Sequence, residues 1–230
     1  LTMGDLGFES DAPRGATTGM NPIILDGWTI DSPEAVAEHL ERVEFPRLQR
    51  ACFEFDENLR AQEIIAQEVA LQLRLGPDML KGGYEAVAFP TLAYTTYGYA
   101  NYFSAYALFP EVIERHFALQ ADLALLNNRA LAQAVLTGGL PPLFRLDHDM
   151  ADSRGTLVSI HSLERLWFPH FSHCLEPLLH NDIRLIWHCD GNLMQMVPRL
   201  LAVGLNGFQG FQYEDGMQYP PICKMKDRQG

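Results

Sequence analysis

The sequence predicts an α/β fold in which parallel strands alternate with helices. From residue 84 onward, short apolar runs alternate with longer amphipathic segments, which is the pattern of βαβ units. The apolar run 183–187 shows little alternation of polar and apolar residues, as expected of a strand that is covered on both faces. These observations are typical of two architectures, a doubly wound sheet and a (β/α)8 barrel. GxGxxG does not occur, so a dinucleotide-binding doubly wound sheet has no support.

The N-terminal part of the chain carries loop and helix signals. Residues 1–30 are rich in Gly, Thr and Pro, and we expect an irregular segment. A helix is expected over 31–43, with Ser32 as its N-cap and a proline at the first helical position. A second helix is expected from about Glu57 to Leu75, where Gly76 and a following proline end it.

The remainder of the chain follows a regular alternation. We expect strands at 84–94, 142–149, 183–189 and 205–211. We expect helices at 98–109, 110–135, 162–180 and 192–203, the third of them broken near Pro169 and the last closed by Gly204. We therefore divide the chain, within one structural domain, into an N-terminal loop and helical segment, 1–83, and a strand-bearing part, 84–230.

Composition and charge exclude several classes of protein. The formal net charge is -12, from 29 acidic and 17 basic residues, which would repel a phosphate backbone, so no nucleic-acid partner is expected. No run of 18 or more apolar residues occurs and the first 20 residues carry no apolar leader, so we expect neither a membrane span nor a secretory signal. The four cysteines are widely spaced without CxxC, which favours reduced thiols in a cytoplasmic protein.

Polar residues gather at the carboxyl ends of the predicted strands, where both parallel architectures place their chemistry. Side chains two residues apart on a strand share a face, so Arg145, Asp147 and Asp149 point the same way, as do His188 and Asp190. A carboxylate near a guanidinium stays ionised, and an imidazole transfers protons near neutral pH. As structural alternatives, Asp149 and Asp190 could serve only as turn or helix-capping residues.

These positions define a candidate site. The catalytic candidates are Asp149, His188 and Asp190, and the substrate-binding candidates are Tyr94, Arg145, Asp147, Tyr213 and Glu214. If the site holds a metal, its ligands are expected to be His188 and Asp190.

Several motifs in the second half resemble those of the uroporphyrinogen decarboxylase superfamily. The resembling segments are LDHDMADSRGTLVSIHSLERLWFPHF, IRLIWHCDGNLMQMVPRLLAVG and the helix FPEVIERHF. The resemblance covers about residues 84 to 212. It implies a (β/α)8 TIM-type barrel, incomplete in this chain, whose mouth would collect Asp149, His188 and Asp190. Because the chain begins at Leu1 and stops near a fifth or sixth strand, we expect a piece of a longer product.

The resemblance implies two activities. The decarboxylase of tetrapyrrole (porphyrin) biosynthesis, a lyase, uses no cofactor, whereas the related methyltransferases exchange methyl groups with a corrinoid protein, often through zinc. The chain departs from both patterns: the Arg-Gln-Ala-Gly-Arg and Ser-Asp-Ile segments of the decarboxylase are missing, and Asp190 stands where the methyltransferases have a cysteine ligand.

Three hypotheses follow. The first is a decarboxylase acting on an anionic tetrapyrrole-type substrate, in which Arg145 holds carboxylates, Asp149 or Asp190 stabilises a protonated intermediate and His188 moves the proton. The second is a corrinoid-dependent methyltransferase with zinc at His188 and Asp190. The third is a non-catalytic barrel-fold binding protein, favoured by the missing arginine segment. In each case the partner is a small molecule, and a second copy of the chain, as a homodimer, could cover the open barrel edges.

Overall fold

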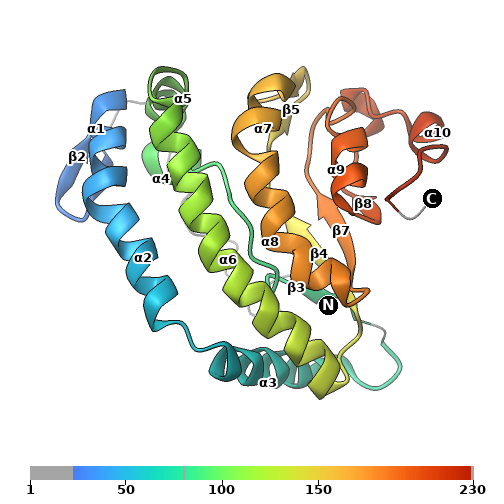
Figure 1. The fold of residues 1–230 in the computed structure, drawn as a ribbon. Helices are drawn as coiled ribbons and strands as arrows, with labels where there is room; N and C mark the ends of the chain where they lie inside the picture. The colour runs from blue at the N-terminus through green and yellow to red at the C-terminus, as the bar shows by residue number, and fades with distance from the viewer. Residues whose placement is uncertain (1–22, 80, 229–230) are drawn as a thin grey trace.

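A computed structural model describes residues 23–79 and 81–228, and their fold is mixed α/β (Figure 1). The predicted parallel sheet is confirmed: it has four strands in the order β3-β4-β7-β8, and every neighbouring pair is parallel. Its strands are β3 Gly83–Tyr84, β4 Leu143–Asp147, β7 Arg184–His188 and β8 Gly207–Gln209. The sequence predicts an irregular segment over residues 1–30, and the first 22 of these residues lie outside the part of the chain that the structure describes.

The helices agree with the expected positions in most of the chain. They are α1 Pro33–His39, α2 Phe45–Glu54, α3 Glu57–Leu75, α4 Tyr94–Tyr97, α5 Tyr99–Leu108, α6 Pro110–Gly138, α7 Ile160–Leu166, α8 Phe168–His180, α9 Val197–Val203 and α10 Tyr219–Ile222, with the π-helix η2 Leu40–Glu44 and the 3-10 helix η3 Tyr213–Asp215. The break near Pro169 is confirmed, since α7 ends at Leu166 and α8 begins at Phe168. None of these helices combines the length and apolar character that crossing a lipid bilayer requires.

The N-terminal helix is longer than the sequence pattern indicates. Ser32 is its N-cap as predicted, because its side chain accepts a hydrogen bond from the backbone N–H of Ala35 at 3.1 Å. Helical backbone then continues from α1 through η2 and α2 to Glu54. Pro46 has no N–H and crowds the preceding turn, and the π-helix η2 directly before α2 accommodates it without ending the helical run.

Two short hairpins were not predicted, and the predicted helix 192–203 and strand 205–211 are shorter than expected. The hairpins are β1 Ile23–Leu25 with β2 Trp28–Ile30, and β5 Ala151–Asp152 with β6 Gly155–Thr156. The first turns at Asp26-Gly27, both with positive φ, which is a favoured hairpin turn that the Gly- and Pro-rich composition concealed. The helix predicted from 192 begins at Val197, and the strand predicted at 205–211 is only β8.

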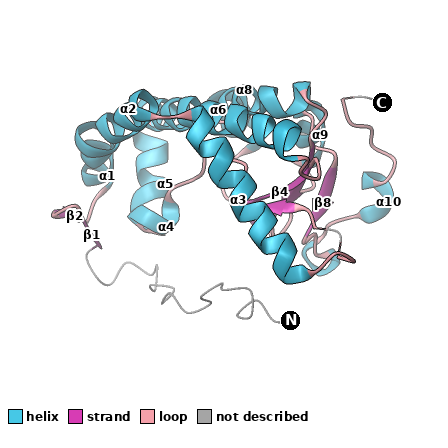
Figure 2. Cartoon of the chain, turned by 90° about the horizontal axis from the view of Figure 1, so that it is seen from below, coloured by secondary structure: helices cyan, strands magenta, loops and turns pink. Residues whose placement is uncertain are grey.

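Helices α6, α8 and α9 lie on one side of the sheet (Figure 2). The side chains of β4 and β7 alternate accordingly: Phe144 and Trp187 are at most 1% exposed, whereas the side chains at 145, 147 and 188 remain partly accessible on the other face. Trp187 contacts Phe171 of α8, with the ring centroids 5.6 Å apart. Burial of these aromatic rings fixes which face of each strand carries the polar side chains.

The predicted strand 84–94 is wrong except at its first residue. Only Gly83–Tyr84 pairs with β4, and the chain then leaves the sheet at Glu85, whose φ of +61° interrupts the extended backbone. The following segment bonds to side chains of α6 instead of to a strand. Asn127 donates to the carbonyl of Ala86 at 2.8 Å, and Asn128 both accepts from the N–H of Ala88 at 3.0 Å and donates to its carbonyl at 2.8 Å. Side-chain amides therefore satisfy the backbone groups that a strand would pair.

We expect Asn128→Ala to lower the free energy of unfolding by roughly 3 kcal/mol, because it leaves buried backbone groups without partners. Asn128 is fully buried and also donates to the carbonyl of Cys174 at 2.8 Å. Urea unfolding followed by circular dichroism measures the change. Gln133→Ala, at an exposed position of the same helix, is the control and should cost less than about 0.5 kcal/mol. Equal losses in the two variants would contradict the role given to Asn128.

Candidate functional site

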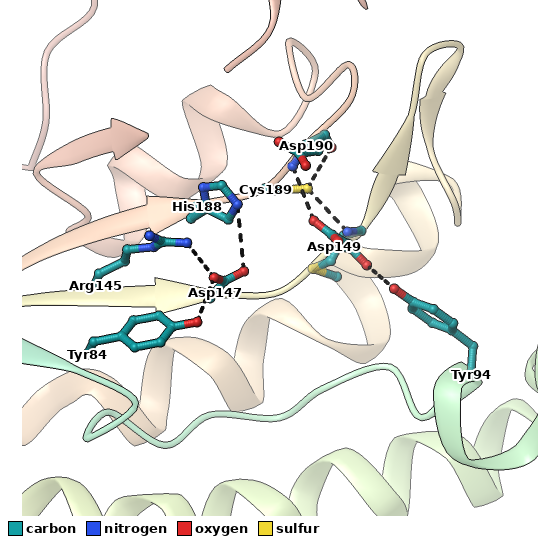
Figure 3. A network of polar contacts seen from close by, with 9 residues as sticks. Tyr84, Tyr94, Arg145, Asp147, Asp149, His188, Cys189 and Asp190 are labelled. Atoms are coloured by element: carbon teal, nitrogen blue, oxygen red, sulfur yellow. Dashed lines mark hydrogen bonds and ion pairs between the residues drawn. The ribbon is translucent and has the colours of Figure 1, made fainter. Parts of the chain in front are cut away.

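Asp147 and His188 end neighbouring strands and face one another. Asp147 is the last residue of β4, His188 is the last residue of β7, and the parallel register pairs them directly. The Nε2 atom of His188 lies 3.9 Å from Oδ1 of Asp147 (Figure 3). Their side chains are 16% and 29% exposed. The prediction that polar side chains of two strand ends share one face is therefore confirmed for this pair.

The other oxygen of Asp147 is held by two donors. Arg145 donates to Oδ2 from two residues earlier on the same strand at 2.5 Å, and the Tyr84 hydroxyl donates to the same oxygen at 3.1 Å. The guanidinium of Arg145 also lies over the Tyr84 ring, 5.0 Å from its centroid. Burial raises the pKa of Tyr84, so its hydroxyl stays protonated and can donate at neutral pH. These contacts orient the carboxylate with Oδ1 toward His188.

Tyr84 is a site residue that sequence reasoning missed. It is the last residue of β3 and pairs with Arg145 in the sheet. In the sequence it opened a predicted strand, far from that strand's carboxyl end. Its contact with Asp147 spans 63 positions of the chain, and only the register of β3 against β4 indicates it.

Asp149 and Asp190 come after the strands and meet through the backbone. Asp149 Oδ1 accepts the N–H of Asp190 at 3.2 Å, which ties the two loops together. The predicted substrate-binding Tyr94 donates to the backbone carbonyl of Asp149 at 2.9 Å and so positions this loop. Burial raises the pKa of Tyr94 to about 12, which keeps it a donor. Within the described residues, no hydrogen bond or ion pair involves the Asp190 carboxylate, which is exposed.

Three side chains of the group could hold a metal ion. Asp147, Asp149 and His188 each offer one ligand atom, and these atoms lie within 4.8 Å of one another. Carboxylate oxygens and an imidazole nitrogen suit zinc and other divalent transition metals. The predicted ligand pair shares His188 with this cluster, but the structure brings the two aspartates at the end of β4 to His188, not Asp190. The hydrogen bonds that Arg145, Tyr84 and the N–H of residue 190 make to the carboxylates would orient them for a metal.

The imidazole of His188 is closed on its other side. Its Nδ1 atom is buried without a hydrogen-bond partner. Gly210, with φ of +82°, packs against the ring so tightly that a Cβ built there would lie 2.3 Å from Nδ1. Any side chain at this position would displace the ring, so Gly210 is a second residue that the strand pattern did not indicate. Nε2 is consequently the nitrogen available for chemistry.

Two of the predicted substrate-binding residues do not join the group. Tyr213 and Glu214 lie on η3 beyond β8, and both are exposed, Tyr213 by 67%. In the described part of the chain, no hydrogen bond or ion pair links either side chain to Asp147, Asp149 or His188. The turn of η3 carries them away from the line of the strand, a change of direction that strand periodicity could not predict.

Beside the group lies a hollow of about 360 Å³. It is lined by Tyr84, Glu85, Val87, Phe89, Arg145, Leu146 and Asp147. The segment that leaves β3 forms one wall, and β4 forms the other. Asp147 therefore faces both this hollow and His188, so a molecule bound in the hollow would contact the carboxylate.

His148 and Cys189 have structural roles. His148 accepts the backbone N–H of Leu92 at its Nε2 atom, 2.9 Å away, and burial lowers its pKa to about 4. Cys189 is fully buried, and its sulfur accepts the N–H of Met150 at 3.3 Å. Burial raises the pKa of this thiol to about 12, so it is not a nucleophile at neutral pH.

Comparison with known proteins identifies no relative: no family model, curated protein or solved structure matches this chain.

We expect His148 to make the protein less stable in acid. Its folded-state pKa of about 4 lies below the usual value near 6.5, so the unfolded chain takes up a proton first and stability falls as pH drops between these values. His148→Gln removes this titration while keeping an acceptor for the Leu92 N–H. When the pH falls from 7 to 4.5, the free energy of unfolding, measured with urea, should fall by roughly 2 kcal/mol less in the variant than in the unaltered protein. An equal loss in both proteins would contradict the buried, neutral imidazole.

Proposed function

We propose that the chain carries the strand-end site of a decarboxylase-type enzyme that acts on an anionic, tetrapyrrole-type substrate within a (β/α)8 barrel. The observation that carries this proposal is the pair Asp147 and His188, which places a carboxylate oxygen 3.9 Å from an imidazole nitrogen at the carboxyl ends of adjacent parallel strands. The resemblance to the uroporphyrinogen decarboxylase superfamily supports the same reading.

The proposed chemistry exchanges one substrate carboxylate for a hydrogen atom. His188 delivers a proton to the pyrrole-type ring, and the resulting cation accepts the electron pair released when carbon dioxide leaves. The carbon that lost carbon dioxide then takes up a proton, and the ring loses the proton that it had received. The net change consumes one proton and needs no oxidant. Asp147 and Asp149 accept ring N–H groups and stabilise the cationic intermediate.

Arg145 has a narrower role than the sequence indicates. Its guanidinium already pairs with Asp147 and stacks on Tyr84. Its Nε atom is buried without a hydrogen-bond partner. We assign it first to orienting Asp147 and second to steadying a substrate carboxylate. Because Asp147, Asp149 and Asp190 carry three negative charges against this one guanidinium, the group favours a developing cation more than a bound anion.

A second candidate function is corrinoid-dependent methyl transfer. The observation that favours it is the ligand cluster of Asp147, Asp149 and His188, whose atoms lie within 4.8 Å. A divalent metal such as zinc bound there would act as a Lewis acid on the methyl acceptor. In this case the partners are a methylated small molecule and a corrinoid protein, and Asp190 holds the Asp149 loop by its N–H instead of ligating the metal.

Decarboxylation is tested by carbon dioxide release from uroporphyrinogen. We expect His188→Gln and Asp147→Asn to lower kcat by about 100-fold, since general acid catalysis and cation stabilisation each contribute on this scale. Glu214→Gln, on the exposed turn of η3, is the matched control and should retain full activity. Unchanged rates in the His188 and Asp147 variants would refute the proposed site.

Metal analysis separates the two candidates. Methyl transfer predicts bound metal by mass spectrometry in the purified protein, lost in Asp149→Asn and kept in Asp190→Asn, because Asp149 and not Asp190 lies in the ligand cluster. Decarboxylation predicts activity that a chelator leaves unchanged. A protein with neither turnover nor metal would match the non-catalytic binding hypothesis.

A further inference from the structure

A second cavity, of about 480 Å³, lies among the N-terminal helices, apart from the strand-end group. Its polar lining comes from the first hairpin, the helical run 33–54, the segment that precedes α4, α4 itself and α6. Apolar side chains that include Leu48, Phe89 and Leu123 complete the wall. Its volume is within the range of about 300–1,000 Å³ that is usual for small-molecule sites.

The charges on this lining are paired with one another. Arg47 donates to Asp26 Oδ2 at 2.6 Å and to Glu44 Oε2 at 3.0 Å. The hydrogen bond from Arg47 lowers the pKa of Asp26, so this carboxyl is ionised at neutral pH. One guanidinium thus lies between two carboxylates. A simple anion would be repelled by both carboxylates, and a simple cation would be repelled by the guanidinium. The lining therefore favours neither.

His39 supplies a buried ring nitrogen at this cavity whose contact with its partner is poorly aligned. The side chain is only 2% exposed, and its Nδ1 atom lies 3.0 Å from the Tyr97 hydroxyl. Because Nε2 faces the Asp26 carboxylate, we place the ring hydrogen on Nε2, so that the Tyr97 hydroxyl donates to Nδ1. Nε2 lies 3.3 Å from Asp26 Oδ2, close enough for an ion pair with this carboxylate but without the alignment of a hydrogen bond. A buried ring nitrogen with so poorly aligned a partner calls for an explanation, and a bound molecule that completes its hydrogen bonding is one.

Another part of the lining is polar but uncharged. Gln120 accepts the N–H of Thr91 at 2.9 Å, and its amide nitrogen lies 3.2 Å from the His116 ring. Burial lowers the pKa of His116 to about 4, so this ring is neutral at neutral pH. The cavity therefore offers donors and acceptors side by side, with little net charge and with apolar surface between them.

We propose that this cavity binds a small polyhydroxy molecule of monosaccharide size, independently of the function proposed for the strand-end site. A hydroxyl group both donates and accepts hydrogen bonds. Neighbouring hydroxyls can accept the Nε2–H of His39 and donate to Asp26 Oδ1 and Glu44 Oε1, the carboxylate oxygens to which Arg47 does not donate. The Phe89 ring and the leucine side chains then cover the C–H surface of the ligand.

The test uses long-range proton–nitrogen NMR spectra of the imidazoles, which report His39 directly, during titration with D-glucose and with myo-inositol. We expect saturable shifts of the His39 signals in the full chain. Glu44→Gln should weaken binding by about tenfold, because it removes a charged acceptor. Glu41→Gln, at an exposed position on the same π-helix, is the matched control and should bind as the unaltered protein does.

Charged analogues of the same shape complete the test. D-glucuronate and D-glucosamine should bind more weakly than D-glucose, because each places a like charge against part of the lining. If the Glu44 variant is unstable, Asp26→Asn serves as the second variant with the same expected weakening. Absence of any saturable His39 shift, tighter binding of either charged analogue, or equal weakening by the Glu41 and Glu44 substitutions would overturn the proposal.

Discussion

The side chains of two neighbouring asparagines on α6 hold the segment that connects β3 to α4, and the candidate site depends on this attachment. Asn127 and Asn128 bind the backbone at Ala86 and Ala88 from inside the core. Asn128 also reaches the carbonyl of Cys174 on α8, so one side chain joins three parts of the fold. Because these amides replace strand pairing, the segment can leave the sheet without burying unpaired backbone groups.

The attached segment in turn positions the loop after β4. The Leu92 N–H meets His148, the Tyr94 hydroxyl meets the carbonyl of Asp149, and the carbonyl of Pro90 accepts the Trp167 indole N–H at 2.8 Å. Asp149 is thereby kept near Asp147 and His188, although it lies beyond the strand. The same segment contributes Phe89 to the linings of both the strand-end hollow and the N-terminal cavity.

Electrostatics explains why the strand-end group suits a proton, a metal ion or a cationic intermediate. Oδ2 of Asp147 is already satisfied by Arg145 and Tyr84, whereas Oδ1 faces His188. Two donors on one oxygen fix the orientation of the carboxylate and leave the opposite oxygen as an oriented acceptor. Gly210 packs against the His188 ring beside Nδ1, so Nε2 is the ring nitrogen that is available for chemistry. A site built in this way directs negative charge at one place without depending on mobile side chains.

Local signals in the sequence determined the alternation of strands and helices, the N-cap at Ser32, and the position of Asp147 and His188 at strand ends that share a face. These follow from periodicity and capping, which depend on neighbours along the chain. The tertiary structure alone decided that Tyr84 joins Asp147, that the segment after β3 is no strand, and that Tyr213 and Glu214 lie elsewhere. Those outcomes depend on the register between strands and on hydrogen bonds from α6, contacts between residues far apart in sequence that no local pattern encodes.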